Sequence, residues 1–117
     1  MIFYIILKEG DLMYKLLIVE DDFIIAKGLQ KHFEKYHYDV QYIEDFEHVL
    51  DEFLEFQPDL VLLDIHLPFF DGYYWCQEIR KISQVPIVFI SSANENMNIV
   101  LAMNMGGDDF INKTFVI

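Results

Sequence analysis

The sequence has little cysteine, few basic residues and no apolar run long enough to cross a bilayer. Its 117 residues hold one cysteine, Cys76, which excludes an internal disulfide framework and a cysteine-based zinc site. Lys and Arg number 8 against 20 Asp and Glu, and the net charge of −12 argues against direct binding of nucleic acid or of an anionic membrane by this chain. We expect a cytoplasmic protein whose partners bring cations, either a divalent metal ion or a basic protein face.

Residues 1–12 begin with an apolar run that is too short for a transmembrane helix, which takes about 20 residues. No basic residue precedes the run and no small-residue cleavage site follows it, so a signal peptide is not expected. Two interpretations remain open. Residues 1–12 are either an added edge strand or arm, or a non-native extension upstream of a true start at Met13. We favour the second and expect one domain over residues 13–117.

Beyond Met13, short apolar runs alternate with amphipathic segments. The runs are rich in β-branched residues and end abruptly at polar residues, which predicts buried parallel strands. We expect strands over 15–19, 39–43, 60–63, 86–90 and 110–112. Helical stripes predict helices over 25–35, 46–55, 75–82 and 94–105. Strands that alternate with helices predict an α/β fold, a doubly wound parallel sheet with helices on both faces.

Polar residues follow these runs directly. Glu20 and Asp21 follow the first run, Asp64 the third, Ser91 the fourth and Lys113 the fifth. Ligands of open α/β sheets bind beyond the carboxyl ends of the strands, so we expect these side chains at one edge. Three neighbouring carboxylates need a cation, and Mg²⁺ prefers oxygen ligands. Because a carboxylate can attack phosphorus, the set predicts a phosphoryl-accepting site in which a metal ion and a lysine offset charge.

Other polar residues have simpler expected roles. We expect Asp22 to cap the first helix, since aspartate is favoured at that position. Asp108 and Asp109 are expected in a solvated turn, and Cys76 is expected to be a buried helix residue rather than a reactive thiol.

Five segments of the sequence, in this order along the chain, resemble the receiver domain of bacterial two-component response regulators. They are residues 17–22, 60–68, 71–72, 86–93 and 106–113. The resemblance covers about residues 14 to 117. It implies a flavodoxin-like fold with a five-stranded parallel sheet of order 2-1-3-4-5. The segments at 74–76 and 90–92 are similar to OmpR-type regulators, in particular to the group that senses cell-envelope antibiotics.

The resemblance implies a role for each matching residue of the acidic site. Asp64 would be the phosphoacceptor, which takes a phosphoryl group from a sensor histidine kinase. Asp21 and Asp64 would bind Mg²⁺ directly, and the backbone carbonyl of His66 would be a third ligand. Glu20 would act on the metal ion through a water molecule.

The resemblance also implies a conformational switch. Ser91 would hold the phosphoryl group and move upon phosphorylation, and Lys113 would pair with that group. Phe110 takes the place of the family's switch aromatic residue, which turns inward as Ser91 moves. Thr114 stands where the family has proline, which leaves the isomer of the Lys113–Thr114 peptide bond open.

The function implied by the resemblance is a phosphorylation-dependent signalling module, not an enzyme, which in full length regulates transcription through a DNA-binding domain. The sequence stops soon after Lys113, so we expect a C-terminally truncated domain. A homodimer would form through the fourth helix, the fifth strand and a final helix, if that helix is present.

Two alternatives come from other classes of protein. One is a receiver-like scaffold that binds partners without phosphorylation. The other is a phosphatase with an aspartate nucleophile, but such enzymes carry a second aspartate two residues later, where His66 stands here.

Overall fold

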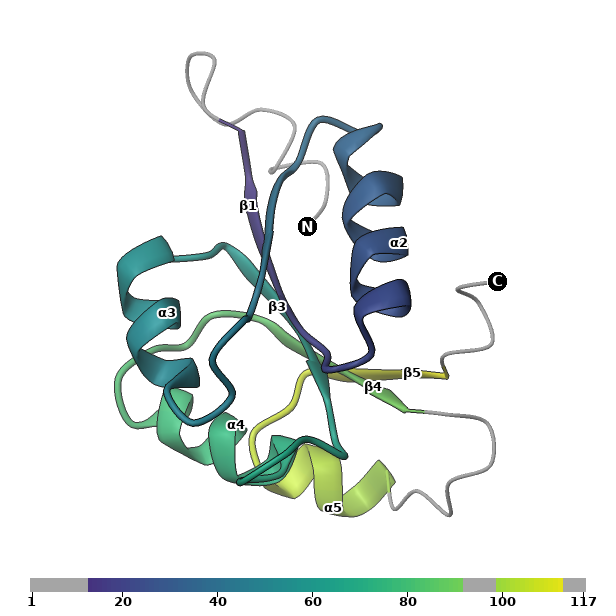
Figure 1. Ribbon diagram of the computed structural model, residues 1–117. Coiled ribbons are helices and arrows are strands. Elements are labelled where there is room, and N and C mark those ends of the chain that lie inside the picture. Colours follow the sequence, from purple (N-terminus) through teal and green to yellow (C-terminus); the bar gives the residue numbers. More distant parts are fainter. Residues whose placement is uncertain (1–12, 92–98, 113–117) are drawn as a thin grey trace.

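The apolar runs of the sequence form the strands of one parallel sheet in the computed structural model, which describes residues 13–91 and 99–112 (Figure 1). The strand order is β2-β1-β3-β4-β5, so the predicted doubly wound sheet and its order are confirmed. The strands are β1 (Lys15–Val19), β2 (Asp39–Tyr42), β3 (Leu60–Asp64), β4 (Ile87–Ser91) and β5 (Asp109–Asn112). The helices are α2 (Phe23–Glu34), α3 (Val49–Phe56), α4 (Gly72–Arg80) and α5 (Ile99–Asn104).

The alternation of side chains along β1 divides the core into two layers. Leu16 and Ile18 pack with α2 on one face of the sheet. Leu17 and Val19 face the other way, into the larger cluster with buried residues of α3, α4 and α5. Figure 1 shows α2 on the opposite side of the sheet from these three helices. All four residues are fully buried, as expected for an interior strand of a sheet that is covered on both faces.

The helix boundaries follow local hydrogen bonds. Asp22 caps α2 as predicted, because its Oδ1 accepts hydrogen bonds from the backbone N–H groups of Ile24, at 3.0 Å, and Ile25, at 3.3 Å. The second helix begins at Val49, later than predicted. Its start is delayed because the backbone N–H groups of Glu44 and Asp45 bind the carboxylate of Glu52 and close a turn.

The predicted apolar stripe of the third helix is wrong at one position. Cys76 is buried in α4 as expected, and burial raises the pKa of its thiol to about 11. Ile82, by contrast, is 52 % exposed and lies beyond the helix, which ends at Arg80. The backbone N–H groups of Ile82 and Ser83 both bind the carbonyl of Ile79, and this tight turn takes Ile82 off the helical face.

Arg80 holds the end of α4 against the turn between α5 and β5. Its guanidinium donates to the carbonyl of Gly106 at 2.9 Å, to the carbonyl of Val85 at 2.7 Å and to the carboxylate of Asp108 at 2.7 Å. The same carboxylate oxygen of Asp108 accepts the backbone N–H of Ile87 at 2.8 Å. The prediction of a solvated turn at residues 108–109 therefore missed these contacts, and Asp109 already belongs to β5. The start of the fourth predicted helix, at residue 94, lies outside the described residues.

None of the helices in the described part of the chain has the length and apolar character needed to cross a membrane.

We predict that Arg80→Ala destabilises the fold much more than Lys81→Ala. The Arg80 side chain is only 16 % exposed, and its loss leaves the carbonyls of Val85 and Gly106 without their charged donor. The free energy of unfolding should fall by about 2–3 kcal/mol. Lys81 forms an exposed pair with Glu78, so its loss should leave stability unchanged. Urea unfolding followed by Trp75 fluorescence measures the free energy of unfolding of both variants. Equal unfolding midpoints for the two variants would contradict the prediction.

Candidate functional site

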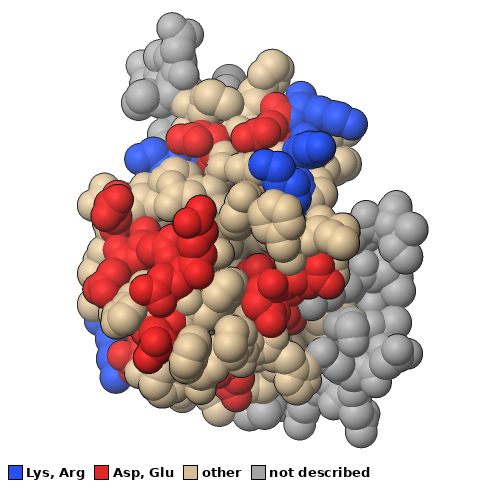
Figure 2. All heavy atoms as spheres, in the orientation of Figure 1, with Lys and Arg blue, Asp and Glu red and all other residues tan. Residues whose placement is uncertain are grey.

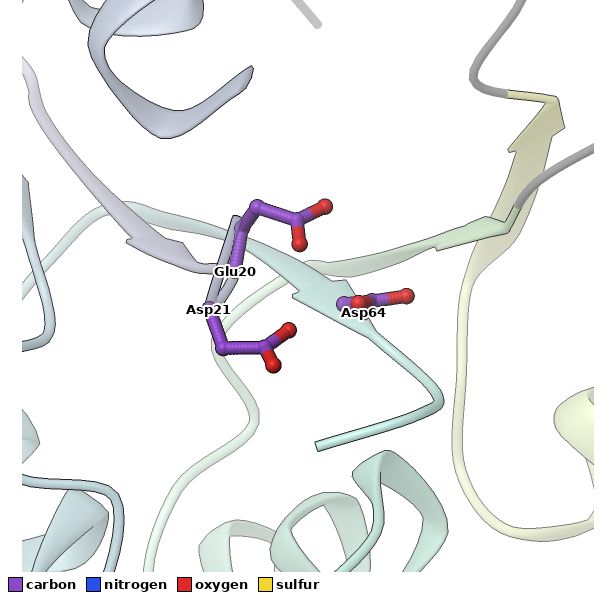
Figure 3. A group of neighbouring side chains, drawn as sticks. All are labelled: Glu20, Asp21 and Asp64. Carbon is purple, nitrogen blue, oxygen red and sulfur yellow. The ribbon is translucent and has the colours of Figure 1, made fainter. Parts of the chain in front are cut away.

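Three acidic side chains meet at the carboxyl ends of two neighbouring strands. Glu20 and Asp21 follow β1, and Asp64 is the last residue of β3. Leu63, the residue before Asp64, lies opposite Val19 of β1. One carboxylate oxygen from each of the three acids lies within 4.8 Å of the others. Figure 3 shows the three carboxyl groups extending to the same side of the strand ends. The structure thus brings together the three acids that the sequence predicts.

Two of these acids are buried. Glu20 is 2 % exposed and Asp64 is 1 % exposed, whereas Asp21 faces solvent. Backbone N–H groups help to orient the buried pair, since Asp22 donates to Glu20 Oε2 at 3.0 Å and Ile65 donates to Asp64 Oδ1 at 2.8 Å. Buried carboxylates in such proximity repel each other, and a cation relieves both the repulsion and the cost of desolvation. A set of carboxylate oxygens fits a hard divalent ion, so the cluster can bind Mg²⁺.

The other predicted site residues differ in their burial and in their position relative to this cluster. Ser91 is fully buried at the end of β4, next to Ile90, which pairs with Asp64. His66 is exposed in the loop after β3. Phe110 is half-buried on β5, opposite Phe89, and packs against the larger core cluster. Lys113 lies outside the described residues, so its place at the site stays a prediction.

The loop between β3 and α4 folds back onto the backbone of the candidate site. Gly72 donates its N–H to the carbonyl of Ile65 at 2.8 Å, and Asp71 caps α4 by accepting the N–H of Tyr74 at 2.9 Å. A Cβ atom at Gly72 would overlap the backbone carbonyl oxygen of Asp64. Glycine is therefore required here for close approach rather than for an unusual backbone angle, because no side chain fits between the helix and the strand end.

A cavity of about 320 Å³ opens beside the acids and was not predicted from the sequence. The residues that line it include the acids Glu20, Asp21 and Glu44 and the aromatic residues Phe23, Tyr42 and Phe46. Residues 44 and 46 belong to the turn before α3, whose path depends on contacts that sequence spacing does not reveal.

The strand order and the acid cluster agree with the fold and the site expected from the sequence, and the comparison with known families gives the same result. Residues 16–117 match the family model of the response regulator receiver domain, and the chain belongs to this family.

The relatives with similar sequences are regulatory proteins whose chains extend well beyond the matched region. The chain is 53 % identical over 103 residues to the transcriptional regulatory protein YvcP of Bacillus subtilis, covering 88 % of this chain and 44 % of that protein. It is 44 % identical over 101 residues to the response regulator protein GraR of Staphylococcus aureus, covering 86 % of this chain and 45 % of that protein. The chain thus spans less than half the length of these relatives.

Solved structures show the same relationship. The N-terminal domain of the nisin resistance regulator NsrR, a lantibiotic response regulator, aligns with a TM-score of 0.80 at 49 % identity, covering 87 % of this chain and 86 % of that one. The BeF3-activated receiver domain of Klebsiella pneumoniae RstA aligns with a TM-score of 0.80 at 36 % identity, covering 86 % of both chains. These relatives confirm the predicted similarity to OmpR-type regulators of the group that senses cell-envelope antibiotics.

We predict that Gly72→Ala weakens Mg²⁺ binding, whereas Gly28→Ala leaves it unchanged. The added methyl group at residue 72 must displace the backbone of Asp64, and disturbances just outside a metal's ligands typically reduce affinity about 10–100-fold. Gly28 lies within α2 with open space where a Cβ would be, so its replacement should raise stability by about 0.5–1 kcal/mol. Calorimetric titration with Mg²⁺ compares the two variants. Equal affinity would show that residue 72 does not position the acids.

Proposed function

We propose that this chain accepts a phosphoryl group on Asp64 and works as the phosphorylation-dependent module of a two-component response regulator. The observation that carries the proposal is the position of Asp64, a buried carboxylate at the end of β3 with an oxygen within 4.8 Å of those of Glu20 and Asp21. Membership of the receiver family supports the same role.

The metal ligands are part of the proposal. Asp21 and Asp64 would hold Mg²⁺ through their carboxylates, the backbone carbonyl of His66 would provide a third ligand, and Glu20 would act through water. When bound, the ion offsets the negative charge of the acids and of the incoming phosphoryl group. The exposed position of Asp21 leaves the cluster open to solvent on one side, from which a donor can approach.

In the proposed transfer, a carboxylate oxygen of Asp64 attacks the phosphorus atom of a phosphohistidine on the kinase. The new O–P bond forms as the P–N bond breaks, and the electron pair of that bond returns to the imidazole, which takes a proton from solvent. The hydrogen bond from Ile65 N–H to Asp64 Oδ1 helps to hold the carboxyl group in one orientation for this attack.

The residues that would respond to the phosphoryl group come from β4 and β5. Ser91 would donate its hydroxyl proton to a phosphoryl oxygen, and Lys113 would pair with the group through its ammonium. The burial of Ser91 beside Ile90, the strand partner of Asp64, supports this role. Phe110 would turn inward as Ser91 moves. Its half-buried position against the core means that a change of rotamer alters the surface of the domain.

The setting of the whole protein is inferred from its relatives. We propose a sensor histidine kinase as the phosphodonor, a cytoplasmic location and a role in transcription through a DNA-binding domain in the full-length protein. A homodimer through α5, β5 and a following helix would carry the signal, and the domain would perform no catalysis beyond its own phosphotransfer. The resemblance to a lantibiotic response regulator supports a signal at the cell envelope.

The test is intact mass after incubation with Mg²⁺ and acetyl phosphate. We expect a gain of one phosphoryl group, which is lost in Asp64→Asn and retained in Asp51→Asn, a matched change on the exposed face of α3. Acetate is the leaving group in this case, so no kinase is required. If the mass does not change while circular dichroism shows an intact fold, the chain is instead a scaffold that works without phosphorylation.

A further inference from the structure

Three exposed aromatic residues are close to one another in the sequence, in the loop after β3 and the first turn of α4. Phe69 is 67 % exposed, Phe70 is 42 % exposed and Tyr74 is 37 % exposed. We call these residues the aromatic patch. The rings of Phe70 and Tyr74 are stacked, with centroids 4.3 Å apart and planes at 18°. Single apolar side chains on a surface need no explanation, but a contiguous group of large ones is typical of an interaction site.

The buried Trp75 supports the patch from below. It is 4 % exposed, and its ring lies edge-on to both Phe70, at 5.6 Å, and Tyr74, at 4.9 Å. These contacts hold the rings of Phe70 and Tyr74 against the core, so this part of the patch is a rigid platform rather than a pair of freely rotating side chains. A rigid aromatic surface loses little conformational entropy when a partner covers it.

The backbone at the patch is strained. Phe69 has a φ of 70°, in the left-handed region that glycine adopts most readily. Its side chain is mostly exposed, so packing within the domain does not compensate for this conformation. Strained residues of this kind cluster at binding sites, where the conformation serves an interaction with another molecule.

The charges around the patch select the kind of partner. Asp71 lies between Phe70 and Tyr74 in the sequence, and its carboxylate is fixed by the N–H of Tyr74. No lysine or arginine occurs between residues 36 and 79. Figure 2 shows acidic side chains gathered over α3 and at the end of β1, while the lysines in that view lie mainly over α2. At the patch itself, a partner meets the carboxylate of Asp71 together with aromatic rings, and Lys81, which lies near Tyr74, is already paired with Glu78.

This combination favours arginine. A guanidinium is planar, stacks on aromatic rings and pairs with a carboxylate, whereas the compact ammonium of lysine is more strongly hydrated and does not stack in this way. A second copy of this chain offers no such group, because its one arginine, Arg80, is already bound to Val85, Gly106 and Asp108. We propose that the aromatic patch docks an arginine-bearing apolar segment of a partner protein. The proposal does not depend on phosphorylation of Asp64.

The test uses three synthetic peptides of one length with Leu at helical spacing and Arg, Lys or Glu at the remaining positions. The whole chain is titrated at saturating Mg²⁺, which occupies the acid cluster. The readout is the indole N–H signal of Trp75 in a ¹H–¹⁵N spectrum, since this is the chain's one tryptophan and it contacts the patch. We expect the Arg peptide to shift this signal at the lowest concentration, the Lys peptide to bind more weakly and the Glu peptide to have no effect.

Variants locate the binding. The Phe69→Gly and Tyr74→Ser substitutions should each reduce the affinity for the Arg peptide about tenfold or more, as removal of a central aromatic contact does at other interfaces. Glycine suits the backbone of residue 69, so the Phe69→Gly variant should melt no lower than the parent chain. Phe23→Ser removes a ring that is 60 % exposed beside the acid cluster, outside the patch, and should leave binding unchanged.

Three outcomes would overturn the proposal. Equal binding of the Arg and Glu peptides would exclude charge selection. Loss of binding in the Phe23→Ser variant but not in the Phe69→Gly variant would place the peptide at the acid cluster. A shift of the Trp75 signal with protein concentration alone, together with a dimer by light scattering, would show that a second copy of this chain covers the patch.

Discussion

Close approach of buried carboxylates at the ends of β1 and β3 is the constraint on which the rest of this structure depends. Taken alone, the arrangement is unfavourable, because Glu20 and Asp64 are shielded from water and lie near a third acid. The arrangement persists because the fully buried residues of β1 and β3 allow only one pairing register between these two strands. The apolar core thus holds together an acidic site to which a cation can bind. Part of the free energy gained by burying the core offsets the repulsion between the acids.

Much of this arrangement follows from the sequence. Buried parallel strands appear as continuous apolar runs, so their positions, and the acids directly after them, are visible without a structure. Glu20, Asp21 and Asp64 were predicted to meet, and they do. The strand order came from the resemblance to a family, since runs and stripes do not specify which strands are neighbours. The role of Lys113 stays a prediction.

What the sequence does not show is decided by backbone angles and by long-range contacts. The left-handed conformation of Phe69 carries no compositional signal, because glycine or asparagine is the usual marker of such a position. The structural role of Arg80 has no local signal in the sequence, since its acceptors at Gly106 and Asp108 are distant in the chain. Ile82 continued a helical stripe in the sequence, but the chain had already turned toward β4. In each case a tertiary contact outweighs the local pattern.

The strand order also has a consequence for the way in which the domain folds. Because β1 lies between β2 and β3, the first three strands of the chain are neighbours in the sheet, and the acids Glu20, Asp21 and Asp64 lie at the ends of two of them. Domains generally fold as units, so these strands and β4, with Ser91, assemble together. The acids thus come close to one another in the same event that forms the core, which supplies the free energy that their mutual repulsion opposes.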